Sequence, residues 1–241
     1  MNTSQALIKV LEENNIKFIF GHPGEQILPF YKALKGSKIK HILCRNEQGA
    51  SIAADAYGRS SGNFGVCLAT AGPGALNLIM GVATAFKDSI PMLVITGDVP
   101  RSLKGNDTFQ DFDLIAIFKN ISIKSFNPHN GKTAILNLKE AIEILKKEPT
   151  GPVHLNLPKD ILLDDDIGDI LNKQFVYTPS FDYSNLEIAI NKLKSSKKPL
   201  IVAGAGIKWS NSIEDLKKLI SKYSIPIAST YHLKGVLNDM C

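Results

Sequence analysis

The chain has 241 residues, of which 44% are hydrophobic and 21% charged, with a formal net charge of +5. This composition is typical of a globular protein with one or two domains. The lysines are scattered without an aromatic-basic module, which argues against nucleic-acid binding, and the longest apolar run, Ile90 to Thr96, is too short to cross a bilayer. The N-terminus carries no signal pattern, so we expect a cytoplasmic protein. The cysteines and histidines lie apart from one another, and no metal site is expected within the chain.

Predicted helices and strands alternate from the N-terminus onwards. A first helix, which Ser4 can cap, precedes a strand over 16–20. Further strands are expected at 39–44, 64–70, 91–97, 122–126 and 153–157, with helices at 27–34, 48–57, 75–86 and 133–147. Such alternation is typical of an α/β fold with helices on both faces of a parallel sheet. We therefore predict a doubly wound parallel six-stranded sheet.

The chain is expected to divide near residue 160. Residues 1–160 hold the six strands, 161–184 read as a linker, and 185–241 begin a second α/β domain. The acidic run Asp164-Asp165-Asp166 is expected to be a solvated part of this linker. Only two strands, near 200–203 and 226–230, precede Cys241, and two strands make a poor core. We therefore expect the second domain to be incomplete and the chain to be truncated.

Glu47 is the acidic residue best placed for chemistry. The segment Arg45-Asn46-Glu47-Gln48-Gly49-Ala50 joins the strand 39–44 to a helix rich in alanine. The carboxyl edge of a parallel strand is where open α/β sheets bind ligands. A helix-capping or ion-pairing role would also explain an acid here, so the position alone leaves both interpretations open.

A glycine-rich turn, Gly72-Pro73-Gly74-Ala75-Leu76-Asn77, follows the third strand. It is close to a dinucleotide-binding fingerprint, and Asp98 ends the next strand, but Asn77 stands in place of the third glycine. That substitution weakens the hypothesis of an NAD-binding module. The free N–H groups at such a helix start can bind an anion or a polar ring. A tight strand-to-helix turn without a ligand is the other interpretation.

Four segments, in order and with matching gaps, resemble the acetolactate synthase large subunit and its thiamine-diphosphate-dependent relatives. They are Phe20-Gly21-His22-Pro23-Gly24, Arg45 to Ala50, Ala71-Gly72-Pro73-Gly74-Ala75 and Gly105-Asn106-Asp107-Thr108-Phe109-Gln110-Asp111. Two further stretches add to the match, namely Asp88-Ser89-Ile90-Pro91 and Gly151 to Asp160. The resemblance covers essentially the whole chain, and the motifs are specific when taken together.

The resemblance implies that residues 1–160 form the domain that binds the pyrimidine ring of thiamine diphosphate. Glu47 would be the catalytic residue, because the matching glutamate hydrogen-bonds N1′ of the aminopyrimidine and favours the tautomer that activates the cofactor. The other implied cofactor-binding residues are Pro23, Gly24, Gly72, Pro73, Asn77 and Gln110. Phe109, like Gln110, would face the reacting end of the cofactor from the partner subunit, and Lys159 would lie near the substrate channel. Loop packing and a surface position are the alternatives for Phe109 and Lys159.

Several positions depart from the family pattern. Three of them carry unusual residues: His22, Glu25 and Asn46. Pro149 replaces an arginine that contacts FAD in flavin-bearing members, and His232 and Leu233 also differ from the flavin-side pattern. Gly204-Ala205-Gly206 does fit the flavin-domain turn, so FAD stays an open alternative. No Gly-Asp-Gly occurs in the chain, so the ligands for Mg²⁺ and the diphosphate are expected outside it.

The resemblance implies an enzyme that decarboxylates pyruvate and condenses the product with a second 2-oxo acid, in branched-chain amino acid biosynthesis. The active site would need a homodimer or higher homo-oligomer and the missing diphosphate-binding half, in cis or in trans. A regulatory small subunit would be a further partner. Another thiamine-dependent 2-oxo-acid decarboxylase or carboligase is the alternative enzyme. A non-catalytic truncated paralogue that dimerises with a full-length relative is the alternative from a different class.

Overall fold

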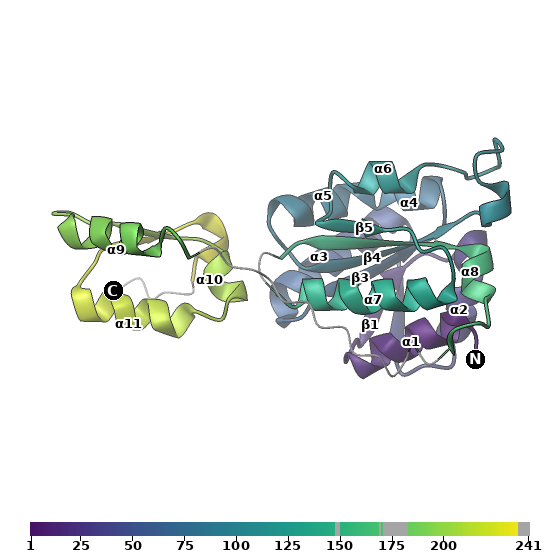
Figure 1. Cartoon of the computed structure of the whole chain (residues 1–241), viewed down its shortest axis with the longest axis horizontal. Helices are drawn as coiled ribbons and strands as arrows, with labels where there is room; N and C mark the ends of the chain where they lie inside the picture. The colour runs from purple at the N-terminus through teal and green to yellow at the C-terminus, as the bar shows by residue number, and fades with distance from the viewer. Residues whose placement is uncertain (148–149, 169, 171–182, 236–241) are drawn as a thin grey trace. The chain divides into compact units, whose positions relative to one another are not determined.

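The computed structural model describes residues 1–147, 150–168, 170 and 183–235, which fall into two compact units. The first unit contains the described residues up to 170 apart from Lys147, and the second contains Lys147 and those from 183 onwards. Figure 1 shows the helices and strands of each unit.

The first unit is built on one six-stranded sheet. Its strands are β1 (Phe18–Gly21), β2 (Lys40–Leu43), β3 (Gly65–Ala69), β4 (Met92–Asp98), β5 (Lys124–Phe126) and β6 (Pro152–Pro158). They lie in the order β2-β1-β3-β4-β6-β5, and every neighbouring pair is parallel. The predicted parallel six-stranded sheet is therefore confirmed. Every residue of β3, β4 and β6 is buried, as expected for central strands that are covered on both faces.

Helices cover both faces of this sheet, so the fold is doubly wound (Figure 1). One face packs against α1 (Thr3–Glu13), α2 (Leu28–Leu34), α7 (Gly131–Leu145) and α8 (Lys159–Leu163). The other face packs against α3 (Glu47–Ser61), α4 (Pro73–Asn77), α5 (Ile79–Lys87) and α6 (Leu114–Phe118). Two short 3₁₀ helices lie in loops at the carboxyl edge, η1 (Glu25–Ile27) and η2 (Arg101–Leu103).

The start of α1 differs from the sequence prediction. Asn2, rather than Ser4, is the N-cap, and its side chain accepts a hydrogen bond from Gln5 N at 3.1 Å. Ser4 is fully buried and its hydroxyl donates to the carbonyl of Leu162 at 2.7 Å. The prediction was wrong because a partner 158 residues away in the sequence takes the Ser4 hydroxyl into the core.

The core of the first unit continues past residue 160. Ile161 and Leu162 are fully buried in it, and Ile167 and Ile170 also belong to it. Asp164 is not a simply solvated residue: its carboxylate accepts from Gly131 N at 3.0 Å, at the start of α7. Hydrogen bonds from the backbone N–H groups of Asp166 and Gly131 lower the pKa of the Asp164 carboxyl below its usual value. Much of the remaining expected linker, residues 171–182, lies outside the described residues.

The second unit contains the elements of a partial domain. These are α9 (Leu186–Ser195), β7 (Ile201–Ala203), α10 (Gly206–Trp209), α11 (Ile213–Tyr223), β8 (Ile227–Ser229) and η4 (Tyr231–Leu233). The two strands are parallel, and the buried core consists of Ala203, Leu216, Ile220 and Leu233. A core of this size is small, and the prediction of an incomplete second domain is confirmed.

Among the described residues of both units, no helix has the length and apolar character needed to cross a membrane.

Candidate functional site

The connections of the sheet diverge between β1 and β3, and we refer to the carboxyl edge of the sheet at this point as the crevice. The chain leaves β1 toward β2 on one side, whereas it leaves β3 toward β4 on the other. Ligands of open α/β sheets bind outside the carboxyl ends of the strands at such a point. The two loops touch there, because a Cβ added at Gly24 would lie 2.5 Å from the Cβ of Thr70. The backbone N–H of Gln26 also donates to the Thr70 hydroxyl at 3.2 Å.

Glu47 is the first residue of α3 and its side chain enters this region. Asn46 is the N-cap of the helix, and its side chain accepts from Gly49 N at 2.8 Å. The Glu47 residue is only 8% exposed. The N-terminal end of a helix carries partial positive charge, which stabilises a carboxylate placed in the first turn. A buried acid is therefore held at the carboxyl edge, where the sequence predicts it.

Asn77 orients the Glu47 carboxylate. Its Nδ2 donates to Glu47 Oε2 at 2.9 Å. The other oxygen, Oε1, lies beside Gly74, where an added Cβ would come within 3.1 Å of it. The missing side chain at position 74 therefore lets the Glu47 carboxylate pack directly against the turn before α4.

The turn before α4 requires its first glycine. Gly72 has φ of +56° and ψ of −122°, a conformation that L side chains rarely adopt. Pro73 is exposed and is the first residue of α4, a position that suits a fixed φ. The predicted helix over 75–86 is instead two helices that meet at Leu78, with Asn77 as the last residue of the first. The short helix thus brings Asn77 to Glu47.

Gln110 belongs to the loop after β4 and packs on Gly72. A Cβ added at Gly72 would lie 2.9 Å from Gln110 Cα, and Gln110 itself has φ of +67°. Gln110 Oε1 is buried, and no hydrogen-bond partner for it lies in the described part of the chain. Phe109 is 79% exposed, so its ring does not line a packed crevice in this unit. The structure therefore brings Gln110 to the site and leaves Phe109 at the surface.

Lys159 and Pro23 lie at the rim of the crevice. Lys159 is the first residue of α8, and its Nζ lies 3.2 Å from Glu25 Oε1. Glu25 follows Gly24 directly, so this ion pair connects Lys159, which was expected near the substrate channel, to the loop after β1. Pro23 in the same loop is exposed. The unusual Glu25 thus has a structural partner in Lys159.

Sequence reasoning missed Thr70 and Tyr31. Thr70 contacts both Gly24 and Gly74 and accepts from Gln26, so it connects the two loops. The signal in the sequence was that Thr70 is a polar residue directly after an apolar strand. The Tyr31 hydroxyl lies 3.1 Å from His41 Nε2, and burial, together with the charges of Cys44 and Glu47, raises the Tyr31 pKa far above its usual value. Nothing in the sequence distinguished Tyr31 from a core residue of its helix.

Asp98 does not have the free carboxylate that a dinucleotide site needs. It is 2% exposed and accepts from Asn156 Nδ2 at 2.7 Å and from Lys104 Nζ at 2.9 Å. Both carboxylate oxygens are already hydrogen-bonded, since Oδ1 also accepts from Val99 N at 2.8 Å. The arrangement argues against the NAD-binding hypothesis.

Comparisons with known proteins agree with this geometry. A family model described as the N-terminal TPP binding domain of thiamine pyrophosphate enzymes matches residues 1–117. A second model, the central domain of thiamine pyrophosphate enzymes, matches residues 186–241. The chain therefore belongs to the thiamine pyrophosphate enzymes.

Within this family the chain is similar to acetolactate synthase large subunits along nearly its whole length. It is 42% identical to a probable acetolactate synthase large subunit of Methanococcus aeolicus over 99% of the chain. It is 40% identical to that of Methanocaldococcus jannaschii over 98% of the chain, and 38% identical to the acetolactate synthase large subunit of Pyropia yezoensis over 97%. The chain spans about two fifths of the length of these relatives, 41% in each case.

The residues of the crevice fit one end of thiamine diphosphate. The Glu47 carboxylate, packed beside Gly74, is a buried acceptor for a ring nitrogen. Gln110 Oε1 offers a further buried acceptor. Among the described residues, no group of three or more His, Cys, Asp and Glu side chains is arranged to hold a metal ion.

Proposed function

We propose that the chain is the pyrimidine-binding part of a thiamine-diphosphate-dependent carboligase of the acetolactate synthase type. The reaction would join pyruvate, after decarboxylation, to a second 2-oxo acid, as a step of branched-chain amino acid biosynthesis. One observation carries the proposal: the buried Glu47 carboxylate at the start of α3, oriented by Asn77 and placed beside Gly74. The similarity to acetolactate synthase large subunits selects this activity among thiamine-dependent reactions.

Glu47 would act on a proton at the pyrimidine ring. When bound, thiamine diphosphate supplies the stabilisation of the carbanion formed by decarboxylation. The Glu47 carboxylate would hold the proton shared with a ring nitrogen, which is general acid–base work at one stated atom. Asn77 keeps Oε2 engaged and so directs Oε1 to the ring. Gly24 and Gly74 let the loops after β1 and β3 pack closely on Thr70 beside Glu47.

The diphosphate end of the cofactor would be bound elsewhere. We propose that Mg²⁺ and its ligands come from a diphosphate-binding half that lies outside this sequence, in cis or in trans. FAD stays an open alternative, because Gly204-Ala205-Gly206 fits the flavin-domain turn whereas Pro149, His232 and Leu233 depart from the flavin-bearing pattern. A cytoplasmic location and a regulatory small subunit remain part of the proposal for the whole enzyme.

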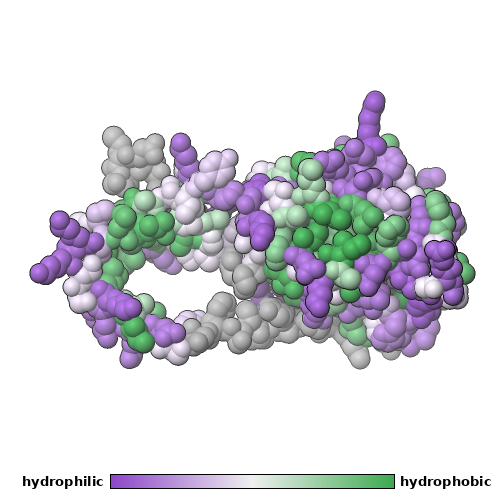
Figure 2. Space-filling view, turned by 90° about the horizontal axis from the view of Figure 1, so that it is seen from above, coloured by the Kyte–Doolittle hydropathy of each residue, from purple (hydrophilic) through white to green (hydrophobic). Residues whose placement is uncertain are grey.

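We propose a homodimer or higher homo-oligomer on the basis of one apolar surface. Figure 2 shows hydrophobic residues gathered on the first unit, on the face seen from above. Helices α3 and α5 on that side of the sheet carry exposed apolar side chains, with Ile52 46% and Met80 59% exposed. An apolar surface of this kind on a single protein marks an interaction site. The site would then be completed where two copies meet.

Replacing Glu47 tests the function. In the complete enzyme, Glu47→Gln is expected to reduce acetolactate formation from pyruvate by about 10²–10⁴-fold, the usual contribution of a positioned acid or base. The fold should persist, since glutamine keeps the size of the side chain and the contact with Asn77. Turnover is measured by acetolactate production with added thiamine diphosphate and Mg²⁺.

Glu140→Gln is the matched control, because Glu140 pairs with Lys124 at the surface of α7, away from the crevice. It should leave turnover unchanged. Near-normal turnover by Glu47→Gln would refute the assignment. An unmodified enzyme without any carboligase activity, with a longer relative co-purifying, would favour the non-catalytic alternative.

A further inference from the structure

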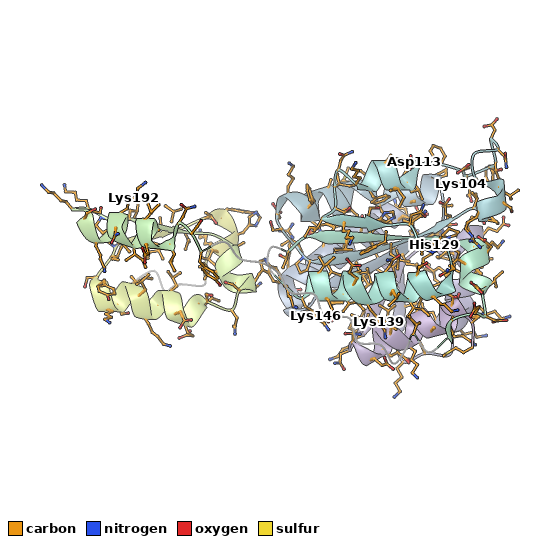
Figure 3. The ribbon with its side chains drawn as sticks, viewed as in Figure 1. Lys104, Asp113, His129, Lys139, Lys146 and Lys192 are labelled. Atoms are coloured by element: carbon orange, nitrogen blue, oxygen red, sulfur yellow. The ribbon has the colours of Figure 1, made fainter. Side chains whose placement is uncertain are left out.

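Lys104 joins two carboxylates at the base of the loop that carries Gln110. Its Nζ lies 2.9 Å from Asp98 Oδ2 and 2.7 Å from Asp111 Oδ1, and it also donates to the carbonyl of Phe112 at 2.7 Å. Asp98 Oδ1 is also within 3.1 Å of Nζ. An ammonium group has three N–H donors, and the two carboxylates and the carbonyl together use all of them. We refer to Lys104, Asp98 and Asp111 as the Lys104 network. Figure 3 shows Lys104 at the end of the first unit where the strands finish.

The Asp98 end of the network is fixed in the sheet by a directed chain of hydrogen bonds. Asn156 Nδ2 donates to Asp98, and Asn156 Oδ1 accepts from Thr96 Oγ1 at 2.8 Å. Because the Thr96 hydroxyl proton is used in this way, its oxygen accepts from His154 Nε2, 2.8 Å away. His154 Nδ1 then accepts from the hydroxyl of Ser125 at 2.7 Å. Every donor in the chain points toward the Asp98 carboxylate, and such series strengthen one another.

The Asp111 end of the network fixes the loop. Asp111 Oδ2 accepts from Gly105 N at 2.6 Å, and Asp111 N donates to the carbonyl of Thr108 at 2.9 Å. These contacts close the segment 105–111 on itself. Gln110, which precedes Asp111 directly, is thereby held in its left-handed conformation with its Cα against Gly72. Gly72 in turn accepts from Leu76 N at 2.9 Å within the first turn of α4.

We propose that Lys104 is a positioning residue, whose ammonium group holds the loop 99–112 over the start of α4 and so places Gln110 against Gly72. What Gln110 then does rests on the proposed function, whereas the holding of the loop does not. Burial alone would lower the Lys104 pKa, but the hydrogen bonds to Asp111 and Asp98 raise it above its usual value, so the Lys104 amine stays protonated.

A second anchor of the loop is weaker. Arg101 pairs with Asp160 at 2.7 Å, but these two side chains are 51% and 34% exposed. The side chain of Asp98 in the Lys104 network is only 3% exposed. Exposed ion pairs contribute little because water and salt screen them. We therefore expect the ion pair of Lys104 with the buried Asp98 to fix the position of the loop more strongly than the pair of Arg101 with Asp160.

Amide hydrogen exchange of the intact protein tests the holding of the loop, with urea unfolding as a check on the global fold. In Lys104→Met, exchange at Gly105 and Asp111 should accelerate at least tenfold, and exchange at Leu76 severalfold, with the sheet amides unchanged. Lys146→Met is the control, since Lys146 is similarly exposed (44%, against 39% for Lys104) and pairs with Glu143 at the far end of α7. It should alter none of these amides. Arg101→Met should leave Gly105 and Asp111 protected.

Two exchange results would overturn the proposal. Unchanged exchange at Gly105 and Asp111 would mean that Lys104 does not hold the loop. Faster exchange there with no change at Leu76 would mean that the loop does not act on α4.

Turnover measurements distinguish a failure of the positioning role of Lys104 from a failure of the proposed enzymatic function. In the complete enzyme, Lys104→Met should lower kcat about tenfold, and the double variant with Gln110→Ala should be no slower than Gln110→Ala alone. Additive losses would show that Lys104 does not act through Gln110 and would overturn the positioning role. If the unmodified enzyme forms no acetolactate, the proposed function fails, and the exchange results still decide whether Lys104 holds the loop.

Discussion

At the scale of single residues, the site depends on one amide donor. Asn77 Nδ2 is 2.9 Å from Glu47 Oε2, and the Asn77 residue is exposed while Glu47 is buried. A hydrogen bond to a charged group contributes about 1.5–3 kcal/mol, which corresponds to roughly 10–100-fold in an equilibrium or rate constant. Asn77 is therefore placed to affect the chemistry more than the stability of the fold.

Two substitutions at Asn77 should differ in severity. Asn77→Ala removes the donor and is expected to lower turnover by about 10–100-fold with little change in the urea midpoint. Asn77→Asp puts a second carboxylate within hydrogen-bonding distance of Glu47, and because like charges repel, its loss should be larger. Steady-state turnover and urea unfolding of both variants check this. Equal losses in the two variants would contradict the assumed charge on Glu47.

At the scale of elements, β6 contributes a histidine that the fold requires to be neutral. His154 is fully buried, stacks on Phe118 with ring centroids 4.2 Å apart, and accepts from Ser125. Burial lowers the His154 pKa from 6.5 to about 3. Since a protonated ring cannot accept from Ser125, acid disrupts the directed chain that reaches Asp98.

Because His154 must be neutral in the fold, we predict that mildly acidic pH destabilises the first unit. Its folded-state pKa lies below the unfolded value, so its contribution is complete above about pH 6.5 and is lost as the pH falls toward 3. Between pH 7 and pH 5 the free energy of unfolding should drop by about 2 kcal/mol. His154→Gln should remove most of this dependence, whereas His129→Gln, at an exposed histidine labelled in Figure 3, should not. Urea titrations at both pH values measure it, and a wild-type protein equally stable at pH 5 and 7 would contradict it.

The elements and the site were predictable from the sequence to different extents. The six strands follow from apolar runs between turn residues, and Glu47 with Asn77 follows from motifs that are each local in the sequence. The hydrogen bonds that fix Asp98 were not predictable, because Asn156 lies 58 residues away in the sequence and only the strand order brings the two together. The same holds for Ser4, whose partner is on α8, and for the break at Leu78, which helical periodicity does not show.

At the scale of the whole molecule, the first unit depends on residues that follow its last strand. The chain after β6 returns to α1, where Thr3 N donates to the Asp164 carbonyl at 2.8 Å and Ser4 bonds to Leu162. Burying one Leu or Ile side chain stabilises a fold by about 1.5–3 kcal/mol, and Ile161 and Leu162 are both fully buried. Ile161, Leu162, Ile167 and Ile170 belong to the same hydrophobic cluster as the buried residues of α1 and α7.

The end point of a shortened chain should therefore decide whether the first unit folds. Residues 1–170 produced alone should unfold cooperatively in urea, whereas residues 1–160 should lose on the order of 5 kcal/mol, from lost burial and lost hydrogen bonds. Because a domain is stable by only about 5–15 kcal/mol, the shorter piece should be largely unfolded or nearly so. Leu163→Ser in the longer piece is the control: Leu163 is 54% exposed, so the urea midpoint should hardly move. Equal midpoints for the two pieces would show that α8 and the residues after it contribute little, and that the first unit is complete at the last strand of its sheet.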